Sequence, residues 1–316
     1  MTLNQLKYLV AIAKYRSFSK TAQNLGISQP ALTSQIKKLE EEMGFVFFDR
    51  TKVPLGITHK GEVFFRRAQQ VLKLTDDMYN IAIELEEEIS GKLLIGAIPT
   101  IAPYLIPVFM DELQKKFPNL HLNIKELITE DIITQVKSGE IDAGIIATPV
   151  KSKGVVFQTL FYEKFFLFVS ENNKFHNLET INISQIDLNE LWYLNEGNCF
   201  QNQVNTLCHI SEKLAQQQNF KYQSNSIESL RFIVEQRGGV TFIPELATLN
   251  IDSAKENLIK EIEGLKPVRE ISLVTTKFLT KQKLIDAFVE ILLKNIPSRM
   301  KSLQKSMILD TQIIAD

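Results

Sequence analysis

Cysteine is almost absent from this chain, whose 316 residues include only two, Cys199 and Cys208. Two cysteines are too few for a disulfide framework, which excludes the small disulfide-rich secreted proteins. The four histidines show no metal-ligand spacing with the cysteines, and no phosphate-cradling glycine loop is present. The sequence therefore predicts neither a metal site nor a cofactor.

Long apolar runs are also missing. No run approaches the roughly 20 residues that span a bilayer. The N-terminal stretch MTLNQLKYLVAIAKYRSFSK interrupts its apolar residues with Gln, Lys and Arg and lacks a small-residue cleavage site, so it is not a secretory signal. We therefore expect a soluble cytoplasmic protein with no membrane partner, in a reducing compartment where a permanent disulfide is not expected.

The chain has no large excess of charge of either sign, but its charge is unevenly spread. The formal net charge is −1, yet residues 1–60 carry nine basic and four acidic side chains. The N-terminal 60 residues are thus basic and the rest of the chain is mildly acidic, which is compatible with nucleic-acid binding by the N-terminal part. At this length, with 44% hydrophobic residues, the chain has enough apolar material for more than one folded core.

The first short helices are indicated by periodicity and by capping residues. Apolar residues recur in steps of three and four from Leu3 to Tyr15, the spacing of an amphipathic helix. Ser19 is expected to cap a second helix in which Ala22 and Leu25 face inward. Gly26 supplies the following turn, because glycine adopts a positive φ at little cost.

A third helix completes a helix-turn-helix pattern. Ser28 is expected to cap it, with Pro30 in the first turn, where the missing N–H costs nothing. Its buried stripe comprises Leu32, Ile36 and Leu39. Its outward face carries side chains of the kinds that bind base edges and phosphates, namely Gln29, Thr33, Ser34 and Lys37. A small wing with Arg50 and Lys52 would follow, and a structural helix bundle without DNA contact is the alternative.

The run SFSKTAQNLGISQPALTSQIKKLEEEMGFVFFDRTKVPLGITHKGEVF resembles the winged helix-turn-helix of the LysR family of transcriptional regulators. It follows the family's core A-x-x-L-x-[IV]-S-Q-P-A-[LV]-[ST]-x-Q-I-x-x-L-E and its downstream elements with the same spacing over about fifty residues. The resemblance implies a DNA-binding domain over residues 1–60. It also implies contacts with double-stranded promoter DNA through Ser28, Gln29, Pro30, Thr33, Ser34, Lys37 and Arg50.

A helix without Gly or Pro is expected from Glu62 to Ile89. Four of its apolar residues fall seven apart and predict a two-stranded coiled-coil seam: Phe64, Val71, Met78 and Leu85. A helix packed on its own core is the alternative. The resemblance implies that residues 61–89 are a linker helix that pairs two chains, so that two recognition helices meet an interrupted palindrome.

Residues 90–316 alternate strand-like and helical runs. GKLLIGAIPT, LHLNIKEL, DAGIIATP and KFFLFVS indicate buried strands, separated by helical stretches such as LIPVFMDELQKKFP and TEDIITQVKSGE. This pattern predicts an α/β effector domain with mostly parallel sheets. The resemblance implies two periplasmic-binding-protein-like subdomains, subdomain I at about 90–162 and 268–300 and subdomain II at about 163–267.

Both cysteines lie in the run EGNCFQNQVNTLC. A helix is expected to begin at Asn198, a good N-cap, or at Cys199, where free N–H groups and the helix dipole favour the thiolate. Unbroken helix would place the Cα atoms of Cys199 and Cys208 roughly 13 Å apart, whereas a disulfide tolerates at most about 7 Å. Joining them would unwind the helix. A redox switch needs this spacing, but two inert thiols would show it too.

The runs IGAIPTIAPYLIP, EGNCFQNQ-x4-C and SIESLRFIVEQRGGVTFIPELA resemble the peroxide-sensing branch of the LysR family. The resemblance implies that Cys199 attacks peroxide as a thiolate and becomes a sulfenic acid, which Cys208 resolves as a disulfide. It further implies that Thr100 and Thr129 line the peroxide pocket through their hydroxyls. In the same way, Arg269 would support the thiolate and the leaving oxygen.

The chain departs from this branch beside the reactive cysteine. Asn198 stands where His is usual, and Gln201 and Asn202 replace the usual Arg-Asp. Because Asn198 carries no proton at neutral pH, we expect sensing with an altered rate or pH dependence. Each assignment has an alternative. Thr100 and Thr129 could instead cap the ends of strands, and Arg269 could be a surface residue. Lys266 is a second candidate for the cation that supports the thiolate.

The resemblance also predicts the partners. These are a second copy of the chain in a homodimer or homotetramer, RNA polymerase, hydrogen peroxide as the signal and a cytosolic thiol reductant. One rival function is a LysR-type regulator that binds a small organic effector and whose cysteines are bystanders. Another is a thiol peroxidase, but an enzyme has no use for a DNA-binding head. We therefore expect a peroxide-responsive activator of antioxidant genes that is not an enzyme.

Overall fold

The computed structural model describes residues 1–84, 88–194, 198–208, 222, 224–264, 266–277, 279, 281–303 and 306–315. Within the long helix of the N-terminal part, side chains are described as far as Thr75 and at Met78. The chain divides into two compact units, one formed by residues 1–87 with 138–140 and the other by the remaining residues. None of the described helices is long and apolar enough to cross a membrane.

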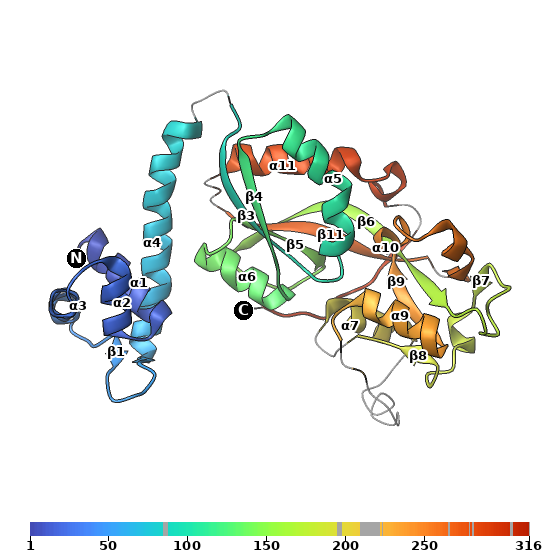
Figure 1. The fold of residues 1–316 in the computed structure, drawn as a ribbon, viewed down its shortest axis with the longest axis horizontal. Coiled ribbons are helices and arrows are strands. Elements are labelled where there is room, and N and C mark those ends of the chain that lie inside the picture. Colours follow the sequence, from blue (N-terminus) through green and yellow to red (C-terminus); the bar gives the residue numbers. More distant parts are fainter. Residues whose placement is uncertain are drawn as a thin grey trace. The chain divides into compact units, whose positions relative to one another are not determined.

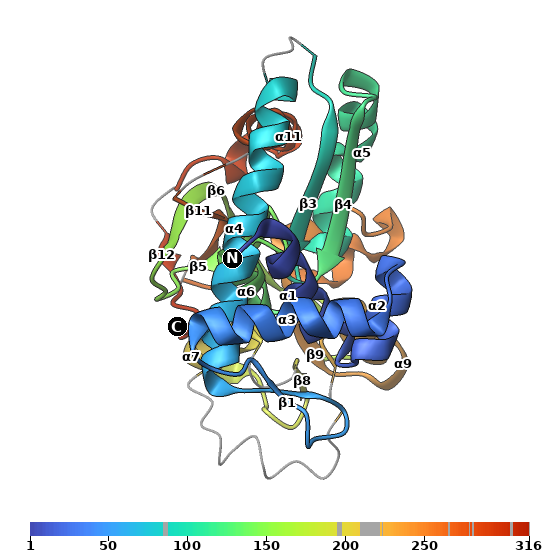
Figure 2. The ribbon, with the colours of Figure 1, turned by 90° about the vertical axis from the view of Figure 1, so that its left-hand side faces the viewer.

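The N-terminal unit is a helix-turn-helix with a wing. Its elements are α1 (Leu3–Tyr15), α2 (Phe18–Leu25), α3 (Gln29–Met43), β1 (Phe48–Asp49), β2 (Gly56–Ile57) and α4 (His59–Glu84). Figure 2 shows α3 from the side, along its whole length. The wing is formed by β1 and β2, which pair as an antiparallel hairpin. The stripe expected to be buried on α3 is confirmed, because Leu32, Ile36 and Leu39 are fully buried. Gly26 takes a φ of 67° after α2, as expected.

The capping prediction for α2 is wrong. The hydroxyl of Ser17 accepts the N–H of Lys20 at 3.3 Å, while Ser19 lies inside the helix. Phe18 begins the helix, and its ring packs edge-on against Phe48. Of the two residues expected to face inward, Ala22 is buried but Leu25 is exposed.

The long helix α4 begins three residues earlier than predicted, because Thr58 caps it. The Thr58 hydroxyl accepts the N–H of Gly61 at 2.9 Å. Gly61 lies so close to the preceding wing that a Cβ atom on it would be 2.2 Å from the main-chain oxygen of Phe47. The glycine in the run ITHKG therefore permits a backbone contact that a side chain would block.

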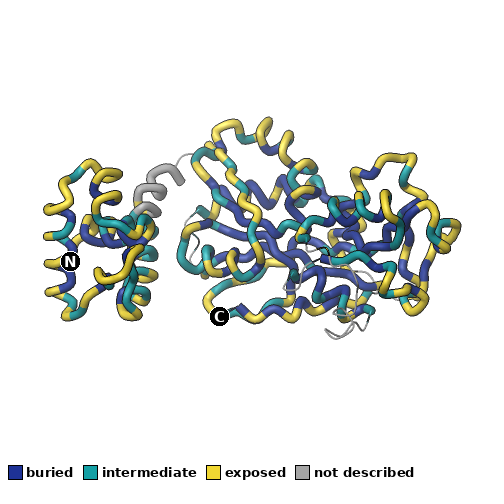
Figure 3. Tube along the Cα trace, turned by 60° about the horizontal axis from the view of Figure 1, so that its bottom comes forward, coloured by how far each residue is buried: buried dark blue, intermediate teal, exposed yellow. Residues whose placement is uncertain are grey.

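The C-terminal unit is an α/β domain. In chain order it contains β3 (Gly91–Ala97), α5 (Ala102–Lys116), β4 (Leu120–Glu126), α6 (Thr129–Ser138), β5 (Ala143–Thr148), β6 (Val155–Val169), β7 (Thr180–Ile181), β8 (Leu191–Trp192), α7 (Cys199–Cys208), α9 (Ile227–Arg237), β9 (Val240–Pro244), α10 (Glu245–Thr248), β10 (Ile259–Ile262), β11 (Pro267–Thr276), α11 (Gln282–Asn295) and β12 (Met307–Ile308). In Figure 1, α5 and α11 lie along one side of the sheet and α6 along the other. Figure 3 shows the strands buried beneath exposed helix surfaces.

The strands pair in the order β4–β3–β5–β11–β6–β10–β7, with β12 beside β11, β9 beside β6 and β8 beside β9. β3 is parallel to β4 and β5, as expected, whereas the long strands β6 and β11 pair antiparallel with each other. β6 pairs with β11 as far as Lys164 and with β9 from Phe165 onward. The single strand β6 thus joins the part of the sheet around β11 to the part around β9. The boundaries of the two subdomains stay a prediction.

The C-terminal segment, residues 306–315, is packed into this unit, which the sequence did not indicate. β12 pairs in parallel with the start of β11, and Ile314 forms a bridge with Lys151. Leu309, Ile313 and Ala315 are buried. The segment therefore forms part of the core of the C-terminal unit.

Candidate functional site

Both cysteines are free thiols at the two ends of α7. The side-chain oxygen of Asn198 accepts the N–H of Phe200 at 3.0 Å, which confirms the predicted N-cap. Because α7 is continuous from Cys199 to Cys208, its rise separates the two Cα atoms by roughly 13 Å. The thiols cannot form a disulfide while α7 is helical.

Cys199 is buried, with 3% of its surface exposed. Its thiol makes a hydrogen bond with the side chain of Thr129, at the start of α6, and another with the main chain of Phe200. Burial raises the pKa of the Cys199 thiol, although the positive charge of Arg269 and both hydrogen bonds lower it. The pKa of Cys199 is therefore raised, whereas the sequence predicted a stabilised thiolate and hence a lowered pKa. Desolvation of the buried thiol outweighs the stabilisation from the helix N-terminus.

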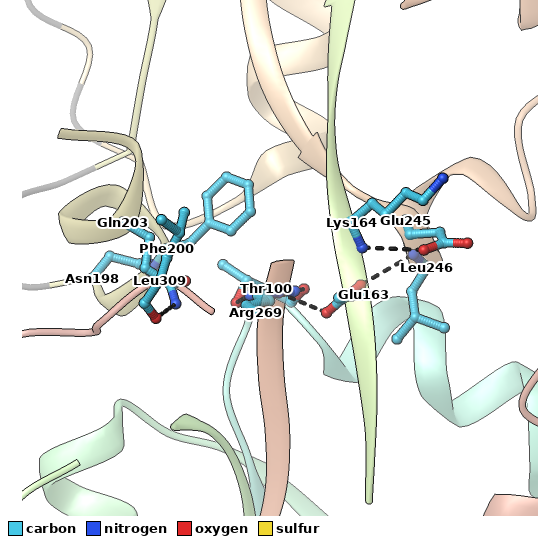
Figure 4. Close-up of polar contacts among 10 residues, drawn as sticks. All are labelled: Thr100, Glu163, Lys164, Asn198, Phe200, Gln203, Glu245, Leu246, Arg269 and Leu309. Atoms are coloured by element: carbon cyan, nitrogen blue, oxygen red, sulfur yellow. Dashed lines mark hydrogen bonds and ion pairs between the residues drawn. The ribbon is translucent and has the colours of Figure 1, made fainter. Parts of the chain in front are cut away.

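Arg269 of β11 is fully buried, which excludes the surface arginine considered above. Its Nε donates to Glu163 at 2.6 Å, its Nη1 donates to the Thr100 hydroxyl at 3.0 Å, and its Nη2 donates to the Thr100 main-chain oxygen at 2.9 Å. The guanidinium also lies over the ring of Phe200, 5.0 Å from its centroid. Figure 4 shows Arg269 between α7 and β6. Lys266 is exposed and does not share this position.

The sequence did not single out Glu163, a fully buried carboxylate on β6. One oxygen of Glu163 accepts from Arg269 and the other accepts the N–H of Leu246 at 3.1 Å. Burial raises the pKa of Glu163, and the neighbouring charge of Arg269 opposes this. Among the described residues, no group of three or more His, Cys, Asp or Glu side chains is placed to hold a metal ion.

Cys208 is half-buried, and burial raises its thiol pKa to about 12. The same helix is tied to the C-terminal segment by side-chain amides. Gln203 donates to the main-chain oxygen of Leu309 at 2.8 Å, and Asn202 donates to that of Thr311 at 3.0 Å. The helical form of α7 and the position of the C-terminal segment therefore depend on each other.

Most of the predicted DNA-binding residues lie on the surface. Thr33 is half-buried, and the exposed ones are Ser28, Gln29, Pro30, Ser34, Lys37 and Arg50. Ser28 also accepts the N–H of Ala31, which confirms its role as the cap of α3. Arg50 is held in place, since its Nη2 donates to Glu40 at 3.2 Å and its guanidinium lies over the ring of Phe18. The wing thus presents an oriented cation.

The predicted dimerisation residues on α4 differ in exposure. Phe64 is half-buried and packs against Phe47 of its own domain, with the ring centroids 4.8 Å apart. Val71 and Met78 are exposed by 40% and 71%. Leu85 lies outside the described residues. On this helix, Val71 and Met78 are part of an exposed apolar surface that also includes Val63 and Leu74 and that a second chain could cover.

Comparison with known proteins decides the family. Residues 3–62 match the model of the bacterial regulatory helix-turn-helix protein, lysR family, and residues 86–297 match the LysR substrate binding domain. The chain is 32% identical to the hydrogen peroxide-inducible genes activator of Haemophilus influenzae, over 87% of this chain and 90% of that protein. The chain belongs to the LysR family of transcriptional regulators, in its OxyR branch.

Other OxyR proteins support this placement. The DNA-binding transcriptional dual regulator OxyR of Escherichia coli is 32% identical over 78% of this chain and 80% of its own length. The structure of the full-length OxyR variant C199D from Pseudomonas aeruginosa has a TM-score of 0.79 and 26% identity, covering 96% of this chain and 99% of that one. The predicted fold class, a winged helix-turn-helix joined to an α/β effector domain, is confirmed.

Proposed function

We propose that this OxyR-branch regulator senses hydrogen peroxide through a reversible disulfide between Cys199 and Cys208 and activates antioxidant genes. The observation that carries the proposal is the buried Cys199 thiol, on which both the Thr129 side chain and the charge of Arg269 act, with Cys208 at the far end of the same helix. Relatives named as hydrogen peroxide-inducible activators support the choice of signal.

The reaction proceeds in two balanced steps. The Cys199 thiol loses its proton, its sulfur attacks one peroxide oxygen, and the O–O bond breaks. The leaving hydroxide takes up a proton, which gives Cys199 sulfenic acid and one water. The Cys208 thiol then loses its proton and its sulfur attacks the sulfenic sulfur. The S–O bond breaks, the displaced hydroxide takes up a proton to give a second water, and the disulfide is closed. A cytosolic thiol reductant returns two electrons and two protons to reset the pair.

The neighbouring polar side chains would hold the peroxide. The Thr100 oxygen accepts a hydrogen bond from Arg269, which leaves its proton to be donated to a peroxide oxygen. Thr129 already touches the sulfur, so it would hold the peroxide close to the attacking atom. Asn198 caps α7 through its oxygen, and its amide N–H groups could also bind peroxide. Asn198 cannot transfer a proton as a histidine would.

Disulfide formation would then change how the regulator binds DNA. The two Cα atoms must approach to about 7 Å, so part of α7 unwinds and its bonds to the C-terminal segment break. In a homotetramer built as a dimer of dimers, with α4 pairing two chains, this rearrangement would change which half-sites the recognition helices occupy. The oxidised form would recruit RNA polymerase to the promoter.

A pair of DNA footprints tests this function. The full-length protein is footprinted on promoter DNA in a thiol buffer and again after peroxide treatment, alongside Cys199→Ser. The wild-type footprint should change on oxidation and return after reduction, whereas Cys199→Ser should keep the reduced footprint in both conditions. Loss of all DNA binding by Cys199→Ser would contradict the division of labour between the two units. A small-effector regulator with bystander cysteines would show no change with peroxide.

A further inference from the structure

Two buried carboxylates in the C-terminal unit make nearly identical sets of bonds. Glu163 accepts a main-chain N–H from Leu246 at 3.1 Å and the Nε of Arg269 at 2.6 Å. Glu245 accepts a main-chain N–H from Lys164 at 3.1 Å and the Nε of Arg299 at 2.6 Å. The arginines differ in position, because Arg269 is fully buried and acts on the Cys199 thiol whereas the Arg299 side chain is 56% exposed.

We propose that Glu163 is a positioning residue for the peroxide reaction, because it holds the Arg269 guanidinium against Thr100 and Phe200 and neutralises part of its charge. Through this contact, Glu163 limits how readily Cys199 ionises. The inference rests on the proposed function, in which Cys199 must ionise to attack peroxide. It adds to that function a buried carboxylate that tunes the ionisation of Cys199 through Arg269, and Glu163 itself touches neither thiol nor peroxide.

The geometry fixes Glu163 and Arg269 relative to each other. Since the second oxygen of Glu163 is held by the Leu246 N–H, the carboxylate cannot turn away from Arg269 without losing a buried hydrogen bond. Arg269 is held in turn by two bonds to Thr100 and by the ring of Phe200 in the first turn of α7. Figure 4 shows this row of residues leading from α7 to α10.

The charge of Glu163 determines whether its replacement raises or lowers the pKa of Cys199. A cation beside a thiol favours the thiolate, and a carboxylate that pairs with the cation weakens this influence, most strongly where water is excluded. Arg269 is shared between Glu163 and the Cys199 thiol, and burial keeps the pKa of that thiol above its ordinary value despite the arginine. Replacing Glu163 with a neutral side chain therefore leaves more of the positive charge to stabilise the thiolate.

Other ionisable groups also lie around Glu163, Arg269 and Cys199. Glu130 of α6 acts on Cys199 and opposes its ionisation. Tyr104 of α5 lies within the influence of Arg269, and Glu245 of α10 within that of Glu163. Each of these groups is unchanged in Glu163→Gln, so a change in the ionisation of Cys199 in that variant reports the substitution at Glu163. Replacing Glu245 alone tests separately whether the loss of a neighbouring buried carboxylate has the same effect.

The test uses the full-length chain with Cys208→Ser, so that Cys199 is the remaining thiol. Its ionisation is followed by thiolate absorbance without peroxide, and its rate of sulfenic acid formation is followed with peroxide, both from about pH 6 up to the highest pH at which the protein stays folded. Glu163→Gln should lower the midpoint of ionisation by about one pH unit. The reaction near neutral pH should then be up to about tenfold faster. Glu245→Gln is the matched control and should keep the parent midpoint.

A Glu163→Gln midpoint equal to that of the parent and of Glu245→Gln would overturn the proposal. Glu163→Asp keeps the charge but shortens the side chain, so it should slow the reaction at every pH and keep the midpoint. If Glu163→Gln does not fold, a slower reaction of Glu163→Asp with an unchanged midpoint supports the proposal, whereas a shifted midpoint, or a rate equal to that of the parent, contradicts it. Failure of Cys199 to react with peroxide in the parent would refute the proposed function, while the ionisation measurement would still decide the role of Glu163.

Discussion

The side-chain amide of Gln203 donates a hydrogen bond to the main-chain oxygen of Leu309 across 2.8 Å, and both residues are buried. The N–H of Leu309 in turn donates to the main-chain oxygen of Val268 at 3.0 Å, one residue before Arg269. A single residue of the C-terminal segment thus joins the helix that bears both thiols to the strand that bears the arginine. Any change in α7 therefore reaches residues 306–315 directly.

Oxidation should loosen the C-terminal segment. When α7 unwinds to close the disulfide, Asn202 and Gln203 no longer reach the main-chain oxygens that they bind in the reduced form. Amide hydrogen exchange in residues 306–315 should therefore become faster after peroxide treatment, with β3 and β4 as an unaffected internal reference. The Cys208→Ser variant should show no such change. Equal protection of this segment in both redox states would contradict the coupling.

Substitution of Gln203 should make the disulfide more favourable. Gln203→Ala leaves the buried Leu309 oxygen without this donor in the reduced form, at a cost of about 1–3 kcal/mol. Because the lost bond belongs to the helical state of α7, the reduction potential of the pair should become more negative by about 20–60 mV. Equilibration in thiol buffers measures it. Gln312→Ala, which removes an exposed bond to Thr206, is the control and should leave the potential unchanged. An unchanged potential in Gln203→Ala would argue against a role for this bond.

Gly61 should be intolerant of a side chain. A Cβ atom there would meet the Phe47 main-chain oxygen at 2.2 Å, so Gly61→Ala should destabilise the N-terminal unit by about 1–3 kcal/mol. His59→Ala, at an exposed neighbouring position, is the control. The only tryptophan, Trp192, lies in the C-terminal unit. Denaturant titration should therefore shift the helical circular dichroism of the N-terminal unit and leave the tryptophan fluorescence transition in place. A coincident shift of both signals would show that the effect is not local.

Local periodicity was enough to predict the DNA-binding unit. The buried stripe of α3, the turn at Gly26 and the cap at Ser28 all depend on residues close in sequence. The cap of α2 was misplaced because Ser17 and Ser19 both precede a helical pattern. The choice between them depends on Phe18, whose ring packs against Phe48 some thirty residues later.

The surroundings of Cys199 were harder to predict, because β6, β11 and the C-terminal segment meet there from distant parts of the chain. Arg269 could not be told from a surface residue until its partners Glu163 and Thr100 were known. Alternation on β6 could have identified Glu163, since it lies in phase with the buried Phe161 and Phe165. A charged residue in the buried phase of a strand requires a partner, and that requirement was the missed signal.

The most direct test of the proposed switch is a count of free thiols in the purified full-length protein after a modest excess of hydrogen peroxide. The account predicts that both thiols disappear together and that peptides containing Cys199 and Cys208 are recovered as one disulfide-linked species, which a dithiol reductant separates again. Cys199→Ser should keep its remaining thiol under the same treatment. Recovery of two free thiols from the peroxide-treated wild type would contradict the account.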